Sequence, residues 1–360
     1  MNAVHRQRAQ LIDAVARPLT EWIADLHAER DPSFAVRYGD DGVQMWRHEI
    51  KLRLMHLAEA VAADRSALFV QNALWSRAAF LAREVDDSDL RHSLACMRTI
   101  CEEQLPDEVR ATASRFIDEA IAAIDQKQSG TDFPSVSDRP EFRLARLYLL
   151  HLLQRNQTNA ANLVFEAARE GKTIPEIYET IITPALVEIG RMWHLQEASV
   201  ADEHYCTAAT QMIMAQLRAR LPRKAPNGKR VLAMSVGGDL HDLGIRMVAD
   251  LFDMDGWTTE YLGANMPTSE VVLALTGENG RPAFDLIAVS ANTTLSVRAV
   301  AGFIDAIRGH PNGKAIPIVV GGSAFRSVDD LWRIVGADGF AKDATSALRI
   351  ADELVSRVAS

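Results

Sequence analysis

The sequence contains no run of about 18 consecutive apolar residues, so it predicts no helix that crosses a lipid bilayer. Its first residues, MNAVHRQRAQLIDAV, also lack the apolar core of a signal peptide. The three cysteines, Cys96, Cys101 and Cys206, cannot all pair and include no CxxC, which argues against a disulfide framework or a zinc knuckle. These absences predict a cytoplasmic protein.

Positive charge is also scarce, because 39 Lys and Arg face 48 Asp and Glu, for a net charge of −9. This balance argues against a chain whose main role is to bind nucleic acid or an anionic membrane. A hydrophobic content of 48% with 24% charged residues excludes wholesale disorder. A length of 360 residues exceeds what one core usually organises, so we expect two or three domains.

Apolar residues follow a helical period over residues 1–126, as in the face made by Ile50, Leu54, Leu57 and Val61. This segment predicts an all-helical domain of five or six helices. Residues 127–140 are polar and are typical of a linker. Residues 141–222 return to a helical pattern of about four helices with short joints, which predicts a four-helix bundle.

The pattern changes over residues 229–360, where KRVLAMSV, FDLIAVSA and AIPIVVGG resemble buried strands separated by amphipathic helices. Strands that alternate with helices predict a doubly wound parallel sheet, so the expected fold combines α and α/β domains. Ligands of such sheets bind outside the carboxyl ends of the strands, where the glycine-rich turns lie.

The turn after the first of these strands reads GGDLHDLG and is not the GxGxxG of a dinucleotide site. A neutral His241 with Asp239 two residues away suits an imidazole that binds a metal while its other nitrogen bonds a carboxylate. A helix-capping aspartate beside an incidental surface histidine would give the same letters. The turn alone leaves both readings open.

Three spaced motifs narrow the choice: D-x-H-x-x-G from Asp239 through His241 to Gly244, Ser290 after the third strand, and Gly321-Gly322 after the fourth. Together they resemble the cobalamin-binding domain family, which includes methionine synthase, corrinoid methyl carriers, adenosylcobalamin mutases and cobalamin light sensors.

The resemblance implies that His241 replaces the cofactor's own base beneath cobalt, with Asp239 and Ser296 as its hydrogen-bond relay. It also implies that Ser290 and Thr294 contact the buried base and that Gly321 and Gly322 leave space for the nucleotide tail. Asn292 departs from the family pattern, in which an apolar residue is usual.

The bundle carries Trp193-His194 followed by Glu203-His204, a W-x9-E-H pattern that resembles the capping bundle of cobalamin photoreceptors of the light-responsive repressor type. A buried tryptophan with two surface histidines is the plainer reading. The resemblance implies that Trp193, Val200, Glu203 and His204 line the upper face of adenosylcobalamin. It further implies that His194 binds cobalt from above after light has expelled the adenosyl group.

The domain order also looks like that of photocobilins, cobalamin photoreceptors with a globin-like N-terminal domain that holds biliverdin. Aromatic and basic residues of residues 1–126 are then candidate biliverdin contacts, although ordinary core aromatics and solvated charges would look the same: Trp46, His48, His56, Trp75, Arg77, Arg83 and His92. Cys96 and Cys101 fall on apolar helix faces, which favours core packing over covalent attachment of a bilin.

The leading expectation is therefore a light-sensing photoreceptor, not an enzyme, that changes its homo-oligomeric assembly and signals to an unknown downstream partner. The absence of a basic recognition helix argues against direct DNA binding. The main alternative is a corrinoid methyl carrier of a methyltransferase system, which a bulky Trp193 over cobalt would hinder. A passive cobalamin store is a third possibility. A mutase is the least favoured, because no substrate barrel is present.

Overall fold

The computed structural model describes residues 1–126, 139–220, 223–277 and 279–358. The chain forms two compact units. The first comprises residues 1–130 with two short later segments, 293–301 and 327–336, and the second contains the remaining residues. Of the predicted linker 127–140, residues 127–138 lie outside the described part of the chain.

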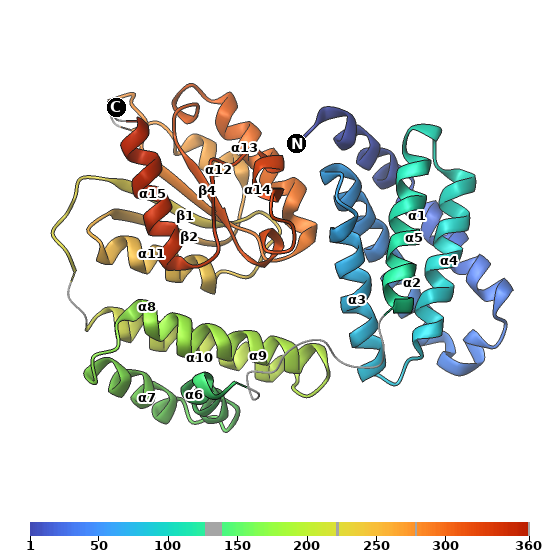
Figure 1. The fold of residues 1–360 in the computed structure, drawn as a ribbon, viewed down its shortest axis with the longest axis horizontal. Helices are drawn as coiled ribbons and strands as arrows, with labels where there is room; N and C mark the ends of the chain where they lie inside the picture. Colours follow the sequence, from blue (N-terminus) through green and yellow to red (C-terminus); the bar gives the residue numbers. More distant parts are fainter. Residues whose placement is uncertain (127–138, 221–222, 278, 359–360) are drawn as a thin grey trace. The chain divides into compact units, whose positions relative to one another are not determined.

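The first unit is built on helices, as the apolar period predicted. Within residues 1–126 they are α1 (Ala3–Arg30), α2 (Phe34–Ala63), α3 (Ser66–Ala82), α4 (Asp87–Gln104) and α5 (Asp107–Gln126). The face of α2 that carries Ile50, Leu54, Leu57 and Val61 is buried, which accounts for the apolar spacing. Figure 1 shows these helices, from blue to teal, running alongside one another.

The second unit begins with the bundle that the sequence predicted. Its helices are the 3-10 turn η2 (Pro140–Phe142), α6 (Arg143–Leu153), α7 (Gln157–Arg169), α8 (Ile174–Ile177), the π-helical turn η3 (Tyr178–Ile182), α9 (Thr183–His194) and α10 (Val200–Arg218). The elements α8, η3 and α9 form one continuous helix, so the bundle has four helical rods. Met247 and Leu251 of the following domain pack into its core.

A five-stranded, all-parallel sheet of order β2-β1-β3-β4-β5 completes the second unit. Its strands are β1 (Arg230–Val236), β2 (Thr258–Met266), β3 (Leu286–Ser290), β4 (Ile318–Gly321) and β5 (Gly339–Ala341). The helices and 3-10 turns between and after them are α11 (Leu243–Met254), α12 (Thr268–Leu273), η4 (Thr294–Ser296), α13 (Val297–Gly309), η5 (Pro311–Gly313), η6 (Ser323–Phe325), α14 (Leu331–Val335) and α15 (Ala344–Val358).

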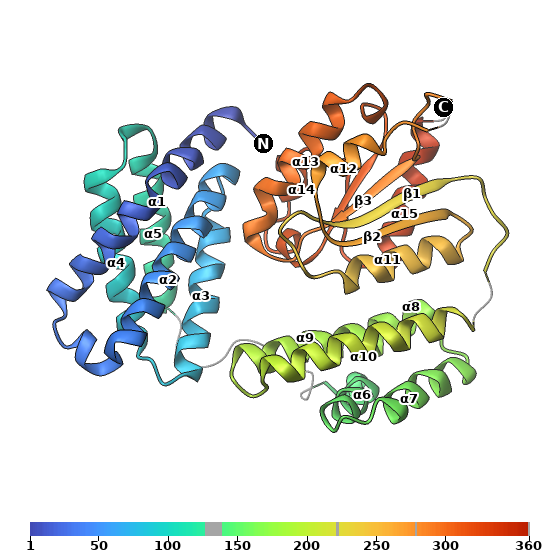
Figure 2. The same cartoon turned by 180° about the vertical axis from the view of Figure 1, so that it is seen from behind.

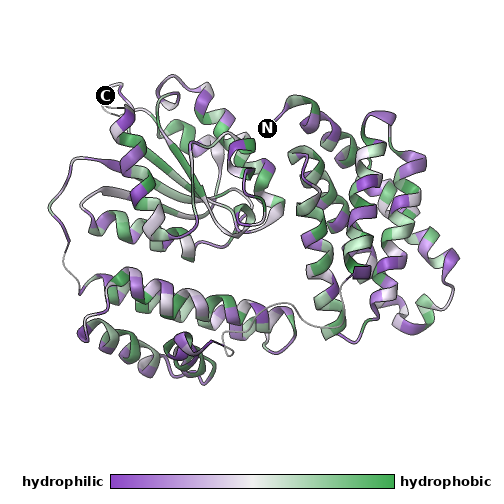
Figure 3. Cartoon of the chain, in the orientation of Figure 1, coloured by the Kyte–Doolittle hydropathy of each residue, from purple (hydrophilic) through white to green (hydrophobic). Residues whose placement is uncertain are grey.

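Buried strand residues divide between the two faces of this sheet. Val231, Ala233 and Ala288 pack with Ile245 of α11 and Ala351 of α15 in one cluster. Figures 1 and 2 show α11 and α15 on this face, with α12 and α13 on the other. Figure 3 shows the central strands in the green of hydrophobic residues and polar residues along the outer sides of the helices. The doubly wound α/β prediction is confirmed.

The strand order reverses between β1 and β3, because β1 lies beside both β2 and β3. Crevices at such reversal points are where open parallel sheets bind ligands. The turns after β1 and β3 carry His241 and Asn292, so the fold brings the predicted motif to this crevice. Among the described helices, none is long and apolar enough to span a membrane.

Candidate cobalamin site

The turn between β1 and α11 presents His241 on a fixed base. Gly238 adopts a φ of 89°, which lets the chain reverse sharply after β1. The imidazole Nδ1 of His241 lies 2.8 Å from Oδ1 of Asp239, and the His241 backbone N–H donates to the same oxygen at 2.9 Å. The Asp239 carboxylate is fully buried, whereas the His241 side chain is 66% exposed. The turn therefore holds one ring nitrogen and leaves the rest of the ring facing out.

The charges of this turn reinforce each other. Burial acts to raise the pKa of Asp239, but hydrogen bonds from His241 and from the Asn292 backbone N–H outweigh it and lower that pKa. The hydrogen bond that His241 donates to Asp239 raises the pKa of His241 against the effect of burial, and the charges of Asp239, Glu203 and Asp242 add to the rise. Glu203 belongs to α10, so the bundle contributes to the field at the imidazole.

The floor of the crevice is polar and buried. Ser235 of β1 and Ser290 of β3 pair in register, and their hydroxyl oxygens lie 2.9 Å apart. Ser235 also donates to the carbonyl oxygen of His241 at 2.9 Å. Ser290, a predicted contact of the base, thus lies directly below the turn that carries the predicted cobalt ligand.

Glycines shape the walls of the crevice in different ways. A Cβ on Gly238 or Gly244 would meet no atom within 4 Å, so both sides of the His241 turn border open space. A Cβ on Gly322 would lie 2.1 Å from the carbonyl oxygen of Ala291, and its φ is 99°. A Cβ on Gly321 would lie 3.1 Å from the Ala341 carbonyl oxygen. Close backbone approach thus requires glycine at position 322 and crowds position 321, a reason separate from the predicted room for a nucleotide tail.

Two further predicted contacts have partners other than those expected. Ser296 is buried and its hydroxyl oxygen lies 3.0 Å from that of Thr293. The described hydrogen bonds of the Asp239 carboxylate come from His241 and Asn292. Asn292 therefore takes the place that the prediction gave to Ser296 in the hydrogen-bond relay. Thr294 belongs to the first unit, where its hydroxyl oxygen lies 2.8 Å from Nδ1 of His56.

The W-x9-E-H pattern spans the turn from α9 to α10, which places both of its ends at one end of the bundle. Trp193 is 39% exposed and Val200 is exposed, whereas His194 is buried. Glu203 accepts a hydrogen bond at 2.8 Å from Thr207 and lies 2.8 Å from Nδ1 of the exposed His204. These residues fill the last turn of one helix and the first turns of the next.

Helix α10 also contacts the His241 turn directly. The side-chain amide of Gln211 lies 3.4 Å from Oδ1 of Asp242, whose other oxygen accepts from the Tyr261 hydroxyl at 2.7 Å. This contact and the charge of Glu203 associate the start of α10 with the crevice. A cofactor bound to His241 would therefore have the W-x9-E-H end of the bundle within the same unit.

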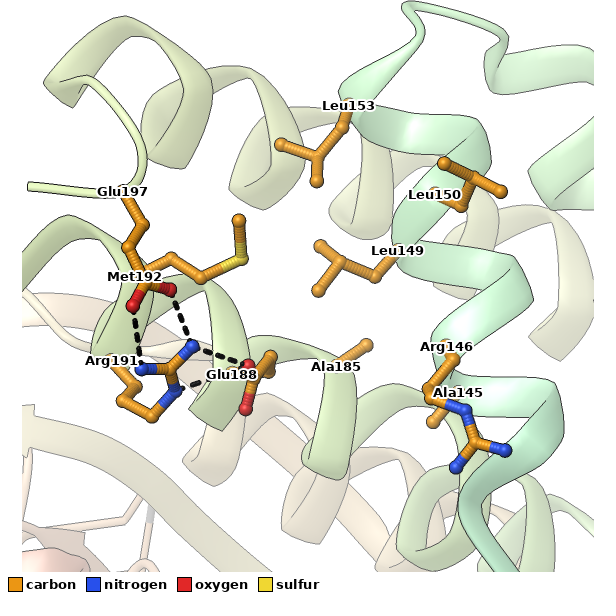
Figure 4. A pocket seen from close by; sticks show the side chains of 10 residues that line it. All are labelled: Ala145, Arg146, Leu149, Leu150, Leu153, Ala185, Glu188, Arg191, Met192 and Glu197. Atoms are coloured by element: carbon orange, nitrogen blue, oxygen red, sulfur yellow. Dashed lines mark hydrogen bonds and ion pairs between the residues drawn. The ribbon is translucent and has the colours of Figure 1, made fainter. Parts of the chain in front are cut away.

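A separate hollow of about 290 Å³ lies between α6 and α9 (Figure 4). Leucines and Met192 form one part of its lining, and Arg191 donates to both Glu188 and Glu197 at its edge. Its lining includes none of the predicted cobalamin contacts. The hollow is distinct from the crevice at the sheet.

The candidate bilin contacts of the first unit do not converge. His48 and Trp75 are exposed, Arg77 is ion-paired with Asp87 at 2.9 Å, and Arg83 donates to a backbone carbonyl at 2.8 Å. Trp46 and His92, in contrast, both lie around the buried His27, with ring centroids 5.6 and 4.7 Å from it. Cys96 and Cys101 are buried and unpaired.

The group around His27 also includes Arg53, which the sequence prediction missed. Arg53 is 2% exposed and its guanidinium lies over Trp46 and Phe80 at 5.3 and 5.4 Å. Several buried polar atoms of this group have no hydrogen-bond partner: both ring nitrogens of His27, Nε1 of Trp46, Nε and Nη2 of Arg53 and Nε2 of His92. Burial, and after it the charge of His92, lower the pKa of His27 to about 4. A signal did exist, because Arg53 falls on the apolar face of α2.

Comparison with known proteins bears on both halves of the second unit. Residues 229–351 match a family described as B12 binding domain, and residues 144–218 match a second family of the same description. The chain is a cobalamin-binding protein. Its two matched segments coincide with the sheet domain and the bundle, so the sequence-based expectation of a corrinoid cofactor is confirmed.

Similar proteins include the dimethylamine corrinoid protein of Methanosarcina barkeri, 24% identical over 198 residues that cover 54% of this chain and 89% of that protein. Monomethylamine corrinoid protein 1 of Methanosarcina acetivorans is 23% identical over 203 residues, or 55% of this chain and 90% of that one. The structure of the Methanosarcina barkeri monomethylamine corrinoid protein has a TM-score of 0.51 at 20% identity, over 58% of this chain and 96% of that one. That likeness shows the fold.

The expectation of a light-sensing photoreceptor is wrong. The relatives found include methylamine corrinoid proteins, which agrees with the alternative of a corrinoid methyl carrier. The W-x9-E-H resemblance therefore misled the functional prediction, while the D-x-H-x-x-G motif gave the cofactor class correctly. The prediction that His194 binds cobalt after light depended on the photoreceptor function and is withdrawn with it.

The residues of the crevice fit a corrinoid. A neutral imidazole is a common metal ligand, and a carboxylate on its other nitrogen fixes the tautomer and orientation. His241 has this arrangement, and Gly238 and Gly244 leave open space on both sides of its turn. Sequence reasoning missed Ser235, which binds the turn from below; a serine within the otherwise apolar LAMSV was the available signal.

Proposed function

We propose that this chain is a corrinoid methyl carrier of a methyltransferase system, with His241 as the lower ligand of cobalt. The observation that carries the proposal is the pair of buried Asp239 and exposed His241 at the reversal point of the sheet. When bound, a corrinoid supplies a cobalt centre that accepts and gives up a methyl group. The names of the methylamine corrinoid relatives support this use of the cofactor.

The residues of this chain hold and cover such a cofactor. Asp239 keeps the Nδ1 side of the His241 ring occupied, which directs the other nitrogen outward. Trp193, Val200, Glu203 and His204 are the residues we assign to the upper face. The side chain of Trp193 is 39% exposed, so it is free to shield cobalt from water between transfers and to move aside for a partner.

The carrier role is tested by repeated methylation. Protein loaded with cob(II)alamin is reduced by titanium(III) citrate, treated with methyl iodide, and followed by its absorption spectrum. An added thiolate then takes the methyl group as a thioether and leaves cob(I)alamin, so that methyl iodide can start the next round. A carrier returns to the methylcobalamin spectrum with one methyl group per cobalt, over several rounds and without releasing the cofactor. Release of the cofactor, or cobalt that methyl iodide cannot reach, would favour a passive store.

We also propose that the first unit binds biliverdin. The support is the group of buried donors without partners around His27 and Arg53, which a planar carboxylate could satisfy. Biliverdin mixed with the protein should give a shifted absorption band, which Arg53→Met abolishes and the exposed substitution Arg98→Met leaves intact. Equal shifts in both variants would refute the assignment.

The adenosyl upper ligand and homo-oligomeric assembly stay predictions of the sequence. Loading with adenosylcobalamin and with methylcobalamin in parallel tests the first, because the preferred ligand is retained more tightly. Size-exclusion chromatography of the loaded protein tests the second.

A further inference from the structure

Asn292 makes more hydrogen bonds around the crevice than its place in the sequence suggested. Its side-chain N–H donates to the carbonyl oxygen of His241 at 3.1 Å, and its side-chain oxygen accepts from the Ser323 backbone N–H at 3.3 Å. Its backbone N–H donates to Asp239, and its backbone carbonyl accepts from the Ser323 hydroxyl at 2.6 Å. Asn292, in the turn after β3, thus joins the turn after β1 to the turn after β4.

The backbone and side-chain bonds of Asn292 have separable roles. Any residue except proline at this position keeps the backbone N–H that bonds Asp239. Only a side chain with both a donor and an acceptor can bond the His241 carbonyl and the Ser323 N–H together. An apolar side chain at this position would make neither bond.

The His241 carbonyl is therefore held from two strands, by Ser235 from β1 and by Asn292 from β3. The imidazole itself is exposed and has Asp239 as its hydrogen-bond partner within the described residues. A turn held on both sides keeps the ring in one position before a ligand arrives, which reduces the ordering cost of binding.

We propose that Asn292 is a positioning residue that preorganises the His241 turn for cobalamin. This inference rests on the proposed role of His241 as the cobalt ligand. Asn292 acts through the backbone of His241, and loss of such an outer partner lowers metal affinity by about tenfold to a hundredfold. Because Ser235 remains in place, we expect the lower end of that range.

The chain offers a matched control in Asn312, which precedes β4 and so lies at the opposite edge of the sheet. Its side-chain N–H groups donate to the Thr276 hydroxyl and the Gly280 carbonyl, at 3.1 and 3.2 Å. Asn312→Leu therefore breaks a comparable link between two loops, away from the crevice. It controls for a general loss of stability.

The experiment measures cob(II)alamin affinity and amide hydrogen exchange in the wild type, Asn292→Leu, Asn312→Leu and His241→Gln. We expect Asn292→Leu to bind about tenfold more weakly and, without cobalamin, to exchange the His241 amide faster, while Asn312→Leu matches the wild type in both. Amide protection in β3 and β4 verifies folding.

Equal affinity and equal exchange in Asn292→Leu and the wild type, with weak binding by His241→Gln, would overturn the role of Asn292 alone. Wild-type affinity in His241→Gln would instead overturn the assignment of the ligand.

Discussion

Two histidines of this chain show opposite ways of using the same side chain. His27, in the first unit, is 1% exposed, and neither of its ring nitrogens has a hydrogen-bond partner. His241, in the second unit, faces outward with one nitrogen held by a buried carboxylate. Burial is the main cause that lowers the pKa of His27 to about 4, whereas the hydrogen bond donated to Asp239 raises the pKa of His241.

The comparison teaches that the hydrogen-bond partners of a histidine indicate its role better than its burial does. His241 is constrained on one side and open on the other, as a metal ligand must be. His27 is enclosed among Phe34, Trp46 and His92, and neither of its ring nitrogens has a hydrogen-bond partner among the described residues. The predictions that follow either break this contrast or sharpen it, from the largest expected effect to the smallest.

The largest effect is expected from His241→Gln. Loss of the ligand itself should weaken cob(II)alamin binding by more than the hundredfold upper range seen for outer partners. Titration followed by absorption measures the affinity. His310→Gln, in the loop before β4, is the control and should bind as the wild type does. Equal binding by the two variants would contradict the contrast between the histidines.

Two buried arginines of the first unit should respond in opposite directions. Arg77 donates to Asp87 at 3.0 Å, and Arg91 also pairs with this carboxylate. Arg77→Met therefore removes one charge-assisted hydrogen bond and should cost about 2 kcal/mol of unfolding free energy. Nη2 of Arg53 lies 3.8 Å from the Glu49 carboxylate, and neither Nη2 nor Nε has a hydrogen-bond partner within the described part of the chain. Arg53→Met should therefore be neutral or stabilising.

Hydrogen exchange in α2 and α3 measures both arginine effects in the full chain. A destabilising Arg53→Met would show that this guanidinium is satisfied without a ligand.

The pH dependence of stability should differ between the two histidines. Because the folded-state pKa of His27 is lowered to about 4, its contribution is full above about pH 6.5. It is lost as the pH falls toward 4, by about 3 kcal/mol. The pKa of His241 is raised, so its contribution is present below about pH 6.5 and is lost as the pH rises.

Denaturant unfolding of the cobalamin-free protein between pH 4 and 8 checks these signs. His27→Phe should flatten the loss of stability at acidic pH, and His241→Phe should leave that loss in place. A reversed outcome would mean that the environments are assigned to the wrong residues.

The smallest effect concerns two buried tyrosines of the bundle. The Tyr178 hydroxyl donates to the buried carboxylate of Asp250 at 2.8 Å, whereas the Tyr148 hydroxyl lies 2.9 Å from that of Thr210. Hydrogen bonds to charged groups are worth about 1.5–3 kcal/mol and neutral ones about 1 kcal/mol. Tyr178→Phe should therefore lower the thermal stability of the bundle more than Tyr148→Phe, by calorimetry; equal losses would show that the Asp250 carboxylate adds nothing.

The fold was predictable because local patterns determine it. Helical periods in residues 1–126 and 141–222, and strands such as LAMSV between glycine-rich turns, depend on residues close in sequence. The pairing of Asp239 with His241 was predictable for the same reason. The cofactor class followed from the spacing of three such motifs.

The rest depended on contacts between distant residues. Asn292 looked like a weakness in the motif, yet it bonds residues about 50 positions before it and about 30 after it. The grouping of His27 with His92 and Trp46 joins three helices, which no local spacing reveals. The functional prediction was wrong because it gave one short pattern, W-x9-E-H, more weight than the architecture shared with corrinoid proteins.

The central claim, that His241 binds cobalt in place of the cofactor's own base, is tested most directly by paramagnetic resonance. Unlabelled cob(II)alamin is added to ¹⁵N-labelled protein, and the nitrogen splitting of the cobalt signal is recorded. A histidine ligand from the protein predicts doublets, because ¹⁵N has a nuclear spin of one half. Triplets from the unlabelled base of the cofactor would contradict the account.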